Sequence, residues 1–220
     1  MSFLGDLNYK IGEYTGFGYN GYAIHLPYYY AGKKTPSQIR NAISSWIGGS
    51  TKTQSEIQAH VLANPSTFGI DCSGLVYYVL NEATGGDVQS FFETQDGVTS
   101  GTYTYAYGIN AAKLTNPSYG GTVITAANDV VPGCIIRSDN GGHVLVVHSV
   151  NKDSSGNVTS IVYAHSNSSD GPHHAYITIG DGTKDLNDSA QTWHDISYTD
   201  IQAKNYYNYT ILIAPVVPYV

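Results

Sequence analysis

The chain has 220 residues, which is enough for one domain with a sizeable hydrophobic core that needs no disulfides. Its formal net charge of −7 and the lack of any Lys/Arg cluster argue against a nucleic-acid partner, and no window approaches the roughly 18 apolar residues of a membrane helix. Only 12% of the residues are charged, whereas 20 are tyrosine and 24 are glycine, which favours an exported or wall-facing protein.

The opening sequence MSFLGDLNYK has neither a basic nor an apolar segment, so no secretory signal is visible. We therefore expect an extracellular or cell-wall protein if a leader was removed or export is non-classical, and a cytoplasmic protein otherwise. The two cysteines allow at most one disulfide, between Cys72 and Cys134, so the chain is not a disulfide scaffold.

The first half of the sequence predicts helices. Its first 32 residues are rich in glycine and tyrosine and indicate turns with a short irregular strand. Residues 35–49 predict a helix with a capping threonine, a proline at its first position and isoleucines on one face. A second helix is expected at 53–65, because Thr53 and Glu56 have the spacing of a capping box.

A third helix is expected to begin near Cys72 and to end at Gly85-Gly86, and a short one around YGINAAKL. Beyond residue 130, the β-branched runs GCIIRS, HVLVVHSV, SIVYAHS, AYITIG and TILIAPVV alternate with turn sequences and predict strands. The second and third runs read as a hairpin. Helices followed by strands favour an α+β fold, in a single domain over residues 1–220.

Cys72 stands where backbone N–H groups and the helix dipole favour a thiolate. A free thiol has a pKa of about 8.5, and such a position can lower it by one to several units. A buried structural cysteine is an equally good interpretation of Cys72 considered alone. A thiolate nucleophile works with an imidazole beside it, so the histidines decide between the two.

Two histidines lie at the ends of expected strands. His143 opens the run HVLVV and His165 ends the run SIVYAHS. If these strands pair, the two rings meet near one end of the sheet, where one takes the thiol proton and the other fixes its tautomer. A hydrogen-bonded turn residue is the commoner role for an isolated histidine such as His143.

The segments DCSGLV and PGCIIRSDNGGHVLVVHSV, with a polar residue on the next strand, resemble the NlpC/P60 cysteine peptidases. That family has a cysteine at a helix start, a histidine at a strand start and a third polar residue on the following strand. Cys72, His143 and His165 fill these places in order. The resemblance covers about residues 27–180 and implies a papain-like fold, in which the nucleophile helix packs on an antiparallel sheet.

The segment PYYYAG, residues 27–32, resembles the family motif P-Y-x-W-G-G, with Tyr30 for the Trp and Ala31 for the first Gly. This match implies that Tyr28 lines the active site as a substrate contact or an oxyanion donor. Asp71 and Ser73 flank the nucleophile and are expected to bind an amine or carboxylate of the substrate. For Ser73, a simple hydrogen bond at the helix start is an equally good interpretation.

The chain also departs from the family pattern. Helices within residues 33–67 look like an insertion that walls one side of the cleft, and Cys134 replaces the aspartate of the usual PGD turn. The separation of His143 and His165 is longer than usual, which an extended hairpin loop would absorb. No role follows for residues 181–205.

The resemblance implies hydrolysis of amide bonds in peptidoglycan stem peptides by thiol acyl transfer, with no cofactor and no metal. One alternative is a related thiol amidase that acts on a non-wall substrate, and another is a non-catalytic, tyrosine-rich module that binds glycan or peptide. A metal site is a third. Its ligands would be His165, Asp170, His173 and His174, although their spacing matches no zinc motif. The sequence does not indicate an oligomeric state.

Overall fold

The computed structural model describes residues 2–119, 122–138, 142–195 and 209–212. It contains α-helices followed by an antiparallel sheet, which confirms the expected α+β class. The helices are α1 (Phe3–Thr15), α2 (Pro36–Ile47), α3 (Gln54–Ala63), α4 (Pro65–Phe68), α5 (Cys72–Ala83), α6 (Asp87–Asp96) and α7 (Ala111–Leu114), with short 3-10 turns at Pro117–Tyr119 and Ala127–Asp129.

The strands are β1 (Gly18–Tyr19), β2 (Tyr22–Ala23), β3 (Thr122–Ile124), β4 (Ile135–Ser138), β5 (His143–Lys152), β6 (Val158–Asn167), β7 (Gly171–Thr178), β8 (Thr192–His194) and β9 (Tyr209–Leu212). β1 and β2 form a small hairpin, and the others form one sheet in the order β3-β9-β4-β5-β6-β7-β8 with antiparallel pairing throughout. The predicted hairpin of HVLVVHSV and SIVYAHS is therefore confirmed as β5–β6.

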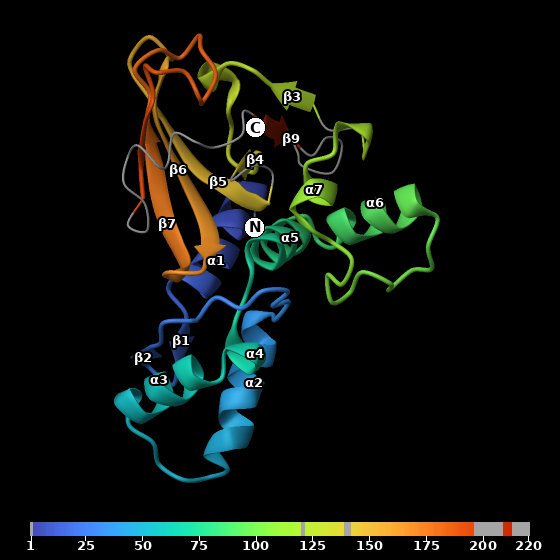
Figure 1. Cartoon of the computed structure of the whole chain (residues 1–220), viewed down its shortest axis with the longest axis vertical. Helices are drawn as coiled ribbons and strands as arrows, with labels where there is room; N and C mark the ends of the chain where they lie inside the picture. Colours follow the sequence, from blue (N-terminus) through green and yellow to red (C-terminus); the bar gives the residue numbers. More distant parts are fainter. Residues whose placement is uncertain (1, 120–121, 139–141, 196–208, 213–220) are drawn as a thin grey trace.

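The sheet separates two hydrophobic cores, because side chains alternate between its faces. Val144 and Val146 of β5 belong to one core with α1 and α5, whereas Leu145 and Val147 belong to the other with Tyr163 and Trp193. Figure 1 shows α5 between the sheet and α6. Helices α2, α3 and α4 gather at the bottom of the view, at the end of the molecule away from β3 and β9. The expected packing of the Cys72 helix on an antiparallel sheet is thus present.

The two helices expected within residues 33–67 are confirmed, and their starts follow from local chemistry. Thr35 and Thr53 each accept a hydrogen bond from the backbone of the third helical residue, and that residue's side chain bonds back to the cap, which completes a capping box at both α2 and α3. α2 ends at Gly48 in the left-handed conformation. Pro65 follows α3 as expected but also begins the one-turn helix α4.

The prediction of turns over the first 32 residues was wrong for its first half, which is helix α1. Ser2 caps this helix, and Leu7, Ile11 and Tyr14 form a buried stripe at helical spacing that packs in the same core as α5. Burial of that stripe outweighs the poor helix propensity of the glycines and tyrosines around it. A two-residue turn at Asn20-Gly21 then closes the β1–β2 hairpin.

The sequence also missed α6, β3 and β8, which are short or lie in segments of mixed composition. The run TILIAPVV falls on β9 only in part, since residues 213–217 lie outside the described residues. Within the described part of the chain, no helix combines the length and the apolarity that crossing a bilayer requires.

Candidate active site

Cys72 is the first residue of α5, as expected, and its side chain is buried to 7% exposure. Asp71 is the N-cap, and its Oδ1 accepts a hydrogen bond of 2.6 Å from the Gly74 N–H. Both cysteines are free, so the thiol of Cys72 is not consumed by a disulfide with Cys134.

The tyrosine segment at 27–32 packs directly against the loop that leads into α5. The Asp71 N–H donates to the carbonyl of Gly32 at 2.9 Å, and the Ile70 N–H donates to the carbonyl of Pro27 at 3.2 Å. A Cβ on Gly74 would lie 2.7 Å from the Gly32 oxygen, so this contact requires glycine in the nucleophile motif. Ala31 has a φ of 61°, a conformation that favours glycine.

The N-terminus of α5 reaches the sheet where β5 and β6 diverge. Their pairing stops at Val146 and Ala164, so the first residues of β5 and the last residues of β6 separate. At this opening the Ser166 hydroxyl donates to the carbonyl of Ile70 at 2.7 Å, and the backbone N–H of Val144 faces the sulfur of Cys72 closely enough to lower its pKa. The sulfur therefore lies beside the residue that follows His143.

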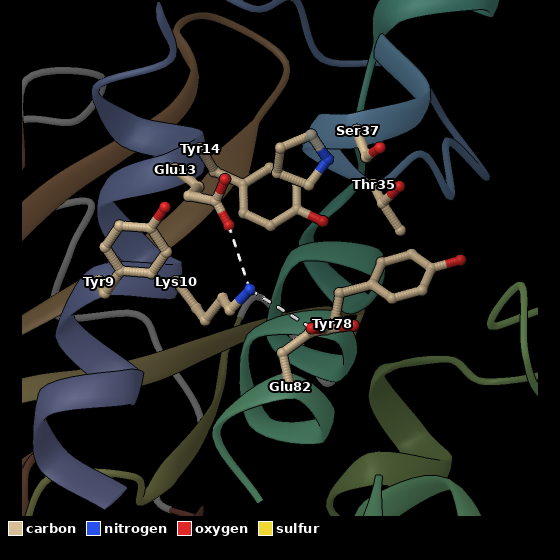
Figure 2. A pocket seen from close by; sticks show the side chains of 9 residues that line it. Tyr9, Lys10, Glu13, Tyr14, Thr35, Ser37, Tyr78 and Glu82 are labelled. Carbon is tan, nitrogen blue, oxygen red and sulfur yellow. Dashed lines mark hydrogen bonds and ion pairs between the residues drawn. The ribbon is translucent and has the colours of Figure 1, made fainter. Parts of the chain in front are cut away.

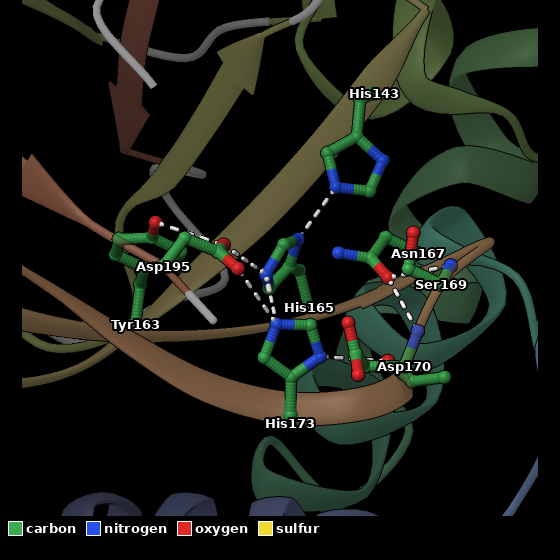
Figure 3. A network of polar contacts seen from close by, with 9 residues as sticks. His143, Tyr163, His165, Asn167, Ser169, Asp170, His173 and Asp195 are labelled. Carbon is green, nitrogen blue, oxygen red and sulfur yellow. Dashed lines mark hydrogen bonds and ion pairs between the residues drawn. The ribbon is translucent and has the colours of Figure 1, made fainter. Parts of the chain in front are cut away.

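His143 begins a series of polar contacts that continues through His165 to Asp195 (Figure 3). Its Nε2 lies 2.7 Å from Nδ1 of His165, and Nε2 of His165 lies 2.8 Å from a carboxylate oxygen of Asp195. His173 joins the same group, with its Nε2 3.1 Å from the other oxygen of Asp195 and its Nδ1 2.9 Å from the carbonyl oxygen of Gly171. The two histidines predicted to meet are thus in contact.

Asp195 is the member of this series that the sequence did not reveal. It follows the short strand β8, which aligns with β7 through the pair Tyr176 and His194 and so brings the next residue beside His165 and His173. Its side chain has no exposed surface, and a buried carboxylate requires donors or a cation around it. No motif surrounds Asp195, so only the sheet register could have identified it.

The electrostatics of the site favour neutral partners. Burial raises the pKa of the Cys72 thiol to about 11, and the negative charge of Asp71 adds to this, against the opposing effects of the Val144 N–H and Lys33. Burial and the neighbouring ring of His165 hold the pKa of His143 well below its usual value. Burial therefore favours a protonated thiol at Cys72 and a neutral imidazole at His143, and the expected lowering of the thiol pKa by the helix start was wrong because desolvation dominates.

We expect the alkylation of Cys72 by iodoacetamide to rise about tenfold per pH unit from pH 7 to pH 10, because the thiolate fraction of a thiol with a pKa near 11 rises in that proportion. Peptide mapping by mass spectrometry gives the rate at Cys72 separately from the fully buried Cys134. A rate that reaches its plateau by pH 7 would show instead a preformed thiolate–imidazolium pair.

A pocket of about 330 Å³ opens beside the thiol. It is lined by Tyr28, Tyr30, Ala31, Lys33, Asp71, Cys72, Ser73, Tyr107, Gly108, Ile109, Asn110, Ala111 and Gly142. All three residues that the sequence assigned to substrate binding are among them, together with Gly142, the neighbour of His143. The thiol, the tyrosine segment and Gly142, the residue before β5, therefore share one cavity.

Lys33 is the second residue of the site that the sequence missed. It is only 7% exposed, and its Nζ donates to Asp71 Oδ1 at 2.7 Å and to the Ser73 hydroxyl oxygen. The two residues expected to bind a substrate amine are thus already bonded to an amine of the chain. An ammonium has three N–H donors, and among the described residues only these two acceptors use them, which leaves one donor for the pocket.

Replacing Lys33 by Met should shift the reactivity of Cys72 away from anions. We expect the ratio of the iodoacetate rate to the iodoacetamide rate to fall at least about fivefold, because removing a unit charge a few ångströms away leaves Asp71 unpaired beside the pocket. Lys34→Met is the matched control, since Lys34 does not line the pocket. An unchanged ratio in Lys33→Met would mean that this ammonium does not act on the pocket.

A second cavity, of about 270 Å³, lies between α1, α2 and α5 (Figure 2). The ammonium of Lys10 lies 3.3 Å from the carboxylates of both Glu13 and Glu82, so its charge is neutralised within the cavity wall. The residues that line it include neither a cysteine nor a histidine. Of these two cavities, only the pocket beside Cys72 therefore has the thiol that acyl transfer requires.

The cluster of His165, His173 and Asp195 could also hold a metal ion. The ligand atoms of His165, His173 and Asp195 all lie within 4.8 Å of one another. This is not the set of four residues considered from the sequence, because Asp170 is not among the three and the ring of His174 packs on His148 with centroids 4.8 Å apart.

Comparison of the chain with protein-family models, with curated proteins and with solved structures finds no match in any of the three.

Proposed function

We propose that the chain is a papain-like cysteine hydrolase of the NlpC/P60 type, which cleaves amide bonds in the stem peptides of peptidoglycan. The observation that supports the chemistry best is the hydrogen-bonded series His143–His165–Asp195, which starts one residue from the N–H that faces the sulfur of Cys72. The substrate class is supported by the motifs DCSG and GGHVLVV and by the pocket rich in tyrosine.

In this proposal the hydrogen bonds set the tautomer of His143. Asp195 is acceptor-only when ionised, so the proton of His165 is on Nε2 and points to the carboxylate. Nδ1 of His165 then accepts from the Nε2–H of His143. This leaves Nδ1 of His143 without a proton, as a general base for the thiol requires.

Acyl transfer then proceeds through neutral reactants. As Cys72 attacks the carbonyl carbon, its proton moves to Nδ1 of His143, and the C–N bond breaks when that proton passes to the leaving amine. Water, deprotonated by the same ring, releases the acyl group as a carboxylic acid and restores the thiol. Because the resting thiol is protonated, proton transfer and attack are coupled in one step.

The charge that develops on the carbonyl oxygen needs donors. The backbone N–H of Cys72 belongs to the first turn of α5, where N–H groups have no intrahelical acceptor, so it can donate to this oxygen. The Tyr28 hydroxyl is the proposed second donor from the pocket wall. Removing one such donor typically costs about 10²–10³ in rate, so Tyr28→Phe distinguishes this role from a substrate contact, which would alter KM.

Digestion of purified peptidoglycan with the full chain tests the proposal. Mass spectrometry of the soluble products should show fragments that differ from intact stem peptides by cleavage of a single amide bond, with one new amine and one new carboxylate. Intact peptidoglycan after prolonged digestion, together with inert synthetic stem peptides, would refute the substrate class, and inertness toward a broad panel of peptide amides would refute the hydrolase.

A non-catalytic binding module is the second candidate, favoured by the exposure of aromatic side chains at the pocket. Tyr30 is 81% exposed and Tyr107 is 62% exposed, and both line the cavity beside Cys72. Such rings are suited to stacking on sugars or peptides. Unchanged retention of peptidoglycan fragments by Cys72→Ala, combined with no hydrolysis by the wild-type chain, would favour this second function.

A further inference from the structure

The polar ends of three side chains converge between β6, β7 and the residue after β8. Nε2 of His165 lies 2.9 Å from Nε2 of His173 and 2.8 Å from one oxygen of Asp195, and the second oxygen lies 3.1 Å from Nε2 of His173 (Figure 3). Two neutral rings that both turned lone pairs toward a carboxylate would repel it and each other. The cluster therefore needs a proton on at least one of these nitrogens, as in the metal-free tautomer described above, or a cation between the three groups.

The outer nitrogens of both rings have the partners that metal-bound histidines need. Nδ1 of His173 lies 2.9 Å from the carbonyl of Gly171, which accepts only, so this nitrogen carries the proton and a neutral ring presents a lone pair at Nε2. Nδ1 of His165 can donate in the same way to Nε2 of His143. Ligand histidines usually donate their second N–H to a carbonyl or similar acceptor, which fixes the ring's orientation.

The spacing of the three groups also allows a shared ion. One potential ligand atom from each of His165, His173 and Asp195 lies within 4.8 Å of the other two. The two Nε2 atoms are 2.9 Å apart, and each also lies close to a different oxygen of Asp195, at 2.8 and 3.1 Å. Two histidines and one carboxylate gathered in this way suit a divalent transition-metal ion.

We propose that His165, His173 and Asp195 bind a divalent transition-metal ion, and that this ion switches off the thiol site. The second part rests on the proposed function, whereas the first part does not. Access to the cluster is through His173, whose side chain is 9% exposed, since the other two side chains have no exposed surface.

The switch follows from the direction of one hydrogen bond. Metal on Nε2 of His165 displaces the proton from that atom, and His165 must then carry its proton on Nδ1, where it points to Nε2 of His143. That proton comes from Nε2 of His143, which takes one from water on Nδ1 in exchange. The proton displaced from Nε2 of His165 passes to water, so the number of protons is unchanged. His143 stays neutral but becomes a donor toward the thiol, so it can no longer act as the base.

Zinc and cobalt titrations of the EDTA-treated full chain test the site. Calorimetry and native mass spectrometry should show one Zn²⁺ per chain, and Co²⁺ should give visible absorption. His173→Gln should weaken this binding at least tenfold, whereas His174→Gln should leave it within threefold, because His174 contacts His148 instead. Equal affinity of the wild-type chain and His173→Gln would overturn the site.

The switch has two readouts. One equivalent of Zn²⁺ should slow both peptide hydrolysis and the alkylation of Cys72 in the wild-type chain, and neither in His173→Gln relative to its own metal-free rate. Inhibition that persists in His173→Gln would show that zinc binds the thiol directly and would overturn the switch. If metal-free protein hydrolyses nothing but still binds Zn²⁺ through His173, the proposed function fails while the metal site stands. The effect of Zn²⁺ on the rate of Cys72 alkylation then tests the switch alone.

Discussion

Cys72→Ala should abolish the hydrolysis of peptidoglycan stem peptides while leaving the fold intact. We expect a loss of roughly 10⁴-fold or more, because the sulfur of Cys72 is the atom that forms the acyl intermediate in the proposed mechanism. The side chain is small and lies at the surface of the pocket, so alanine should change the thermal unfolding midpoint little. Release of fragments, measured by mass spectrometry, gives the rate.

Cys134→Ala is the matched control for this change. Cys134 is also a free cysteine, fully buried, with a pKa raised by that burial to about 12, and it lies outside the pocket beside Cys72. Its sulfur accepts a hydrogen bond from the Val131 N–H, so its loss should affect stability and not turnover. Hydrolysis that survives Cys72→Ala but not Cys134→Ala would eliminate the mechanism.

His143→Ala should reduce hydrolysis by about 10³-fold, because general base catalysis contributes typically 10²–10⁴. The measurement is kcat/KM for a stem peptide at pH 7. His165→Ala should cause a smaller loss, since His165 acts only through the orientation and tautomer of His143. Both effects should appear in kcat more than in KM, as neither ring lines the pocket.

His148→Ala controls for the loss of an imidazole from the same strand. His148 lies on β5 at the bulge in its pairing with β6, and its ring packs against His174 and not against His143. We expect nearly unchanged turnover in this variant. A loss equal to that of His143→Ala would indicate that any disturbance of β5 is damaging, and would remove the evidence for a specific base.

Local sequence signals predicted the elements that local chemistry determines. The capping boxes at Thr35 and Thr53 fix α2 and α3, and the N-cap at Asp71 fixes the start of α5. The β-branched runs between turn sequences predicted β5 and β6, and their pairing brought His143 to His165 as predicted. α1 escaped detection because the glycines and tyrosines of the first 32 residues favour turns, and this signal masked the apolar stripe of Leu7, Ile11 and Tyr14 at helical spacing.

The missed parts of the site depend on distant contacts. Asp195 reaches the histidines only through the register of β7 with β8, and Lys33 reaches Asp71 only because the tyrosine segment packs on the loop before α5. The thiol pKa was predicted in the wrong direction for the same reason. The helix start is visible in the sequence, whereas the loss of solvent around Cys72 is a property of the assembled fold.

The sheet with a separate core on each face has a consequence for how this site tolerates change. Cys72 belongs to the core shared with α1 and α5, whereas Tyr163, which contacts His165 and Asp195, belongs to the core on the opposite face. The proposed nucleophile and the proposed histidine series are thus supported by different cores, on the two faces of the sheet. A substitution that creates a cavity in one core should displace the half of the proposed site that packs on it more than the other half.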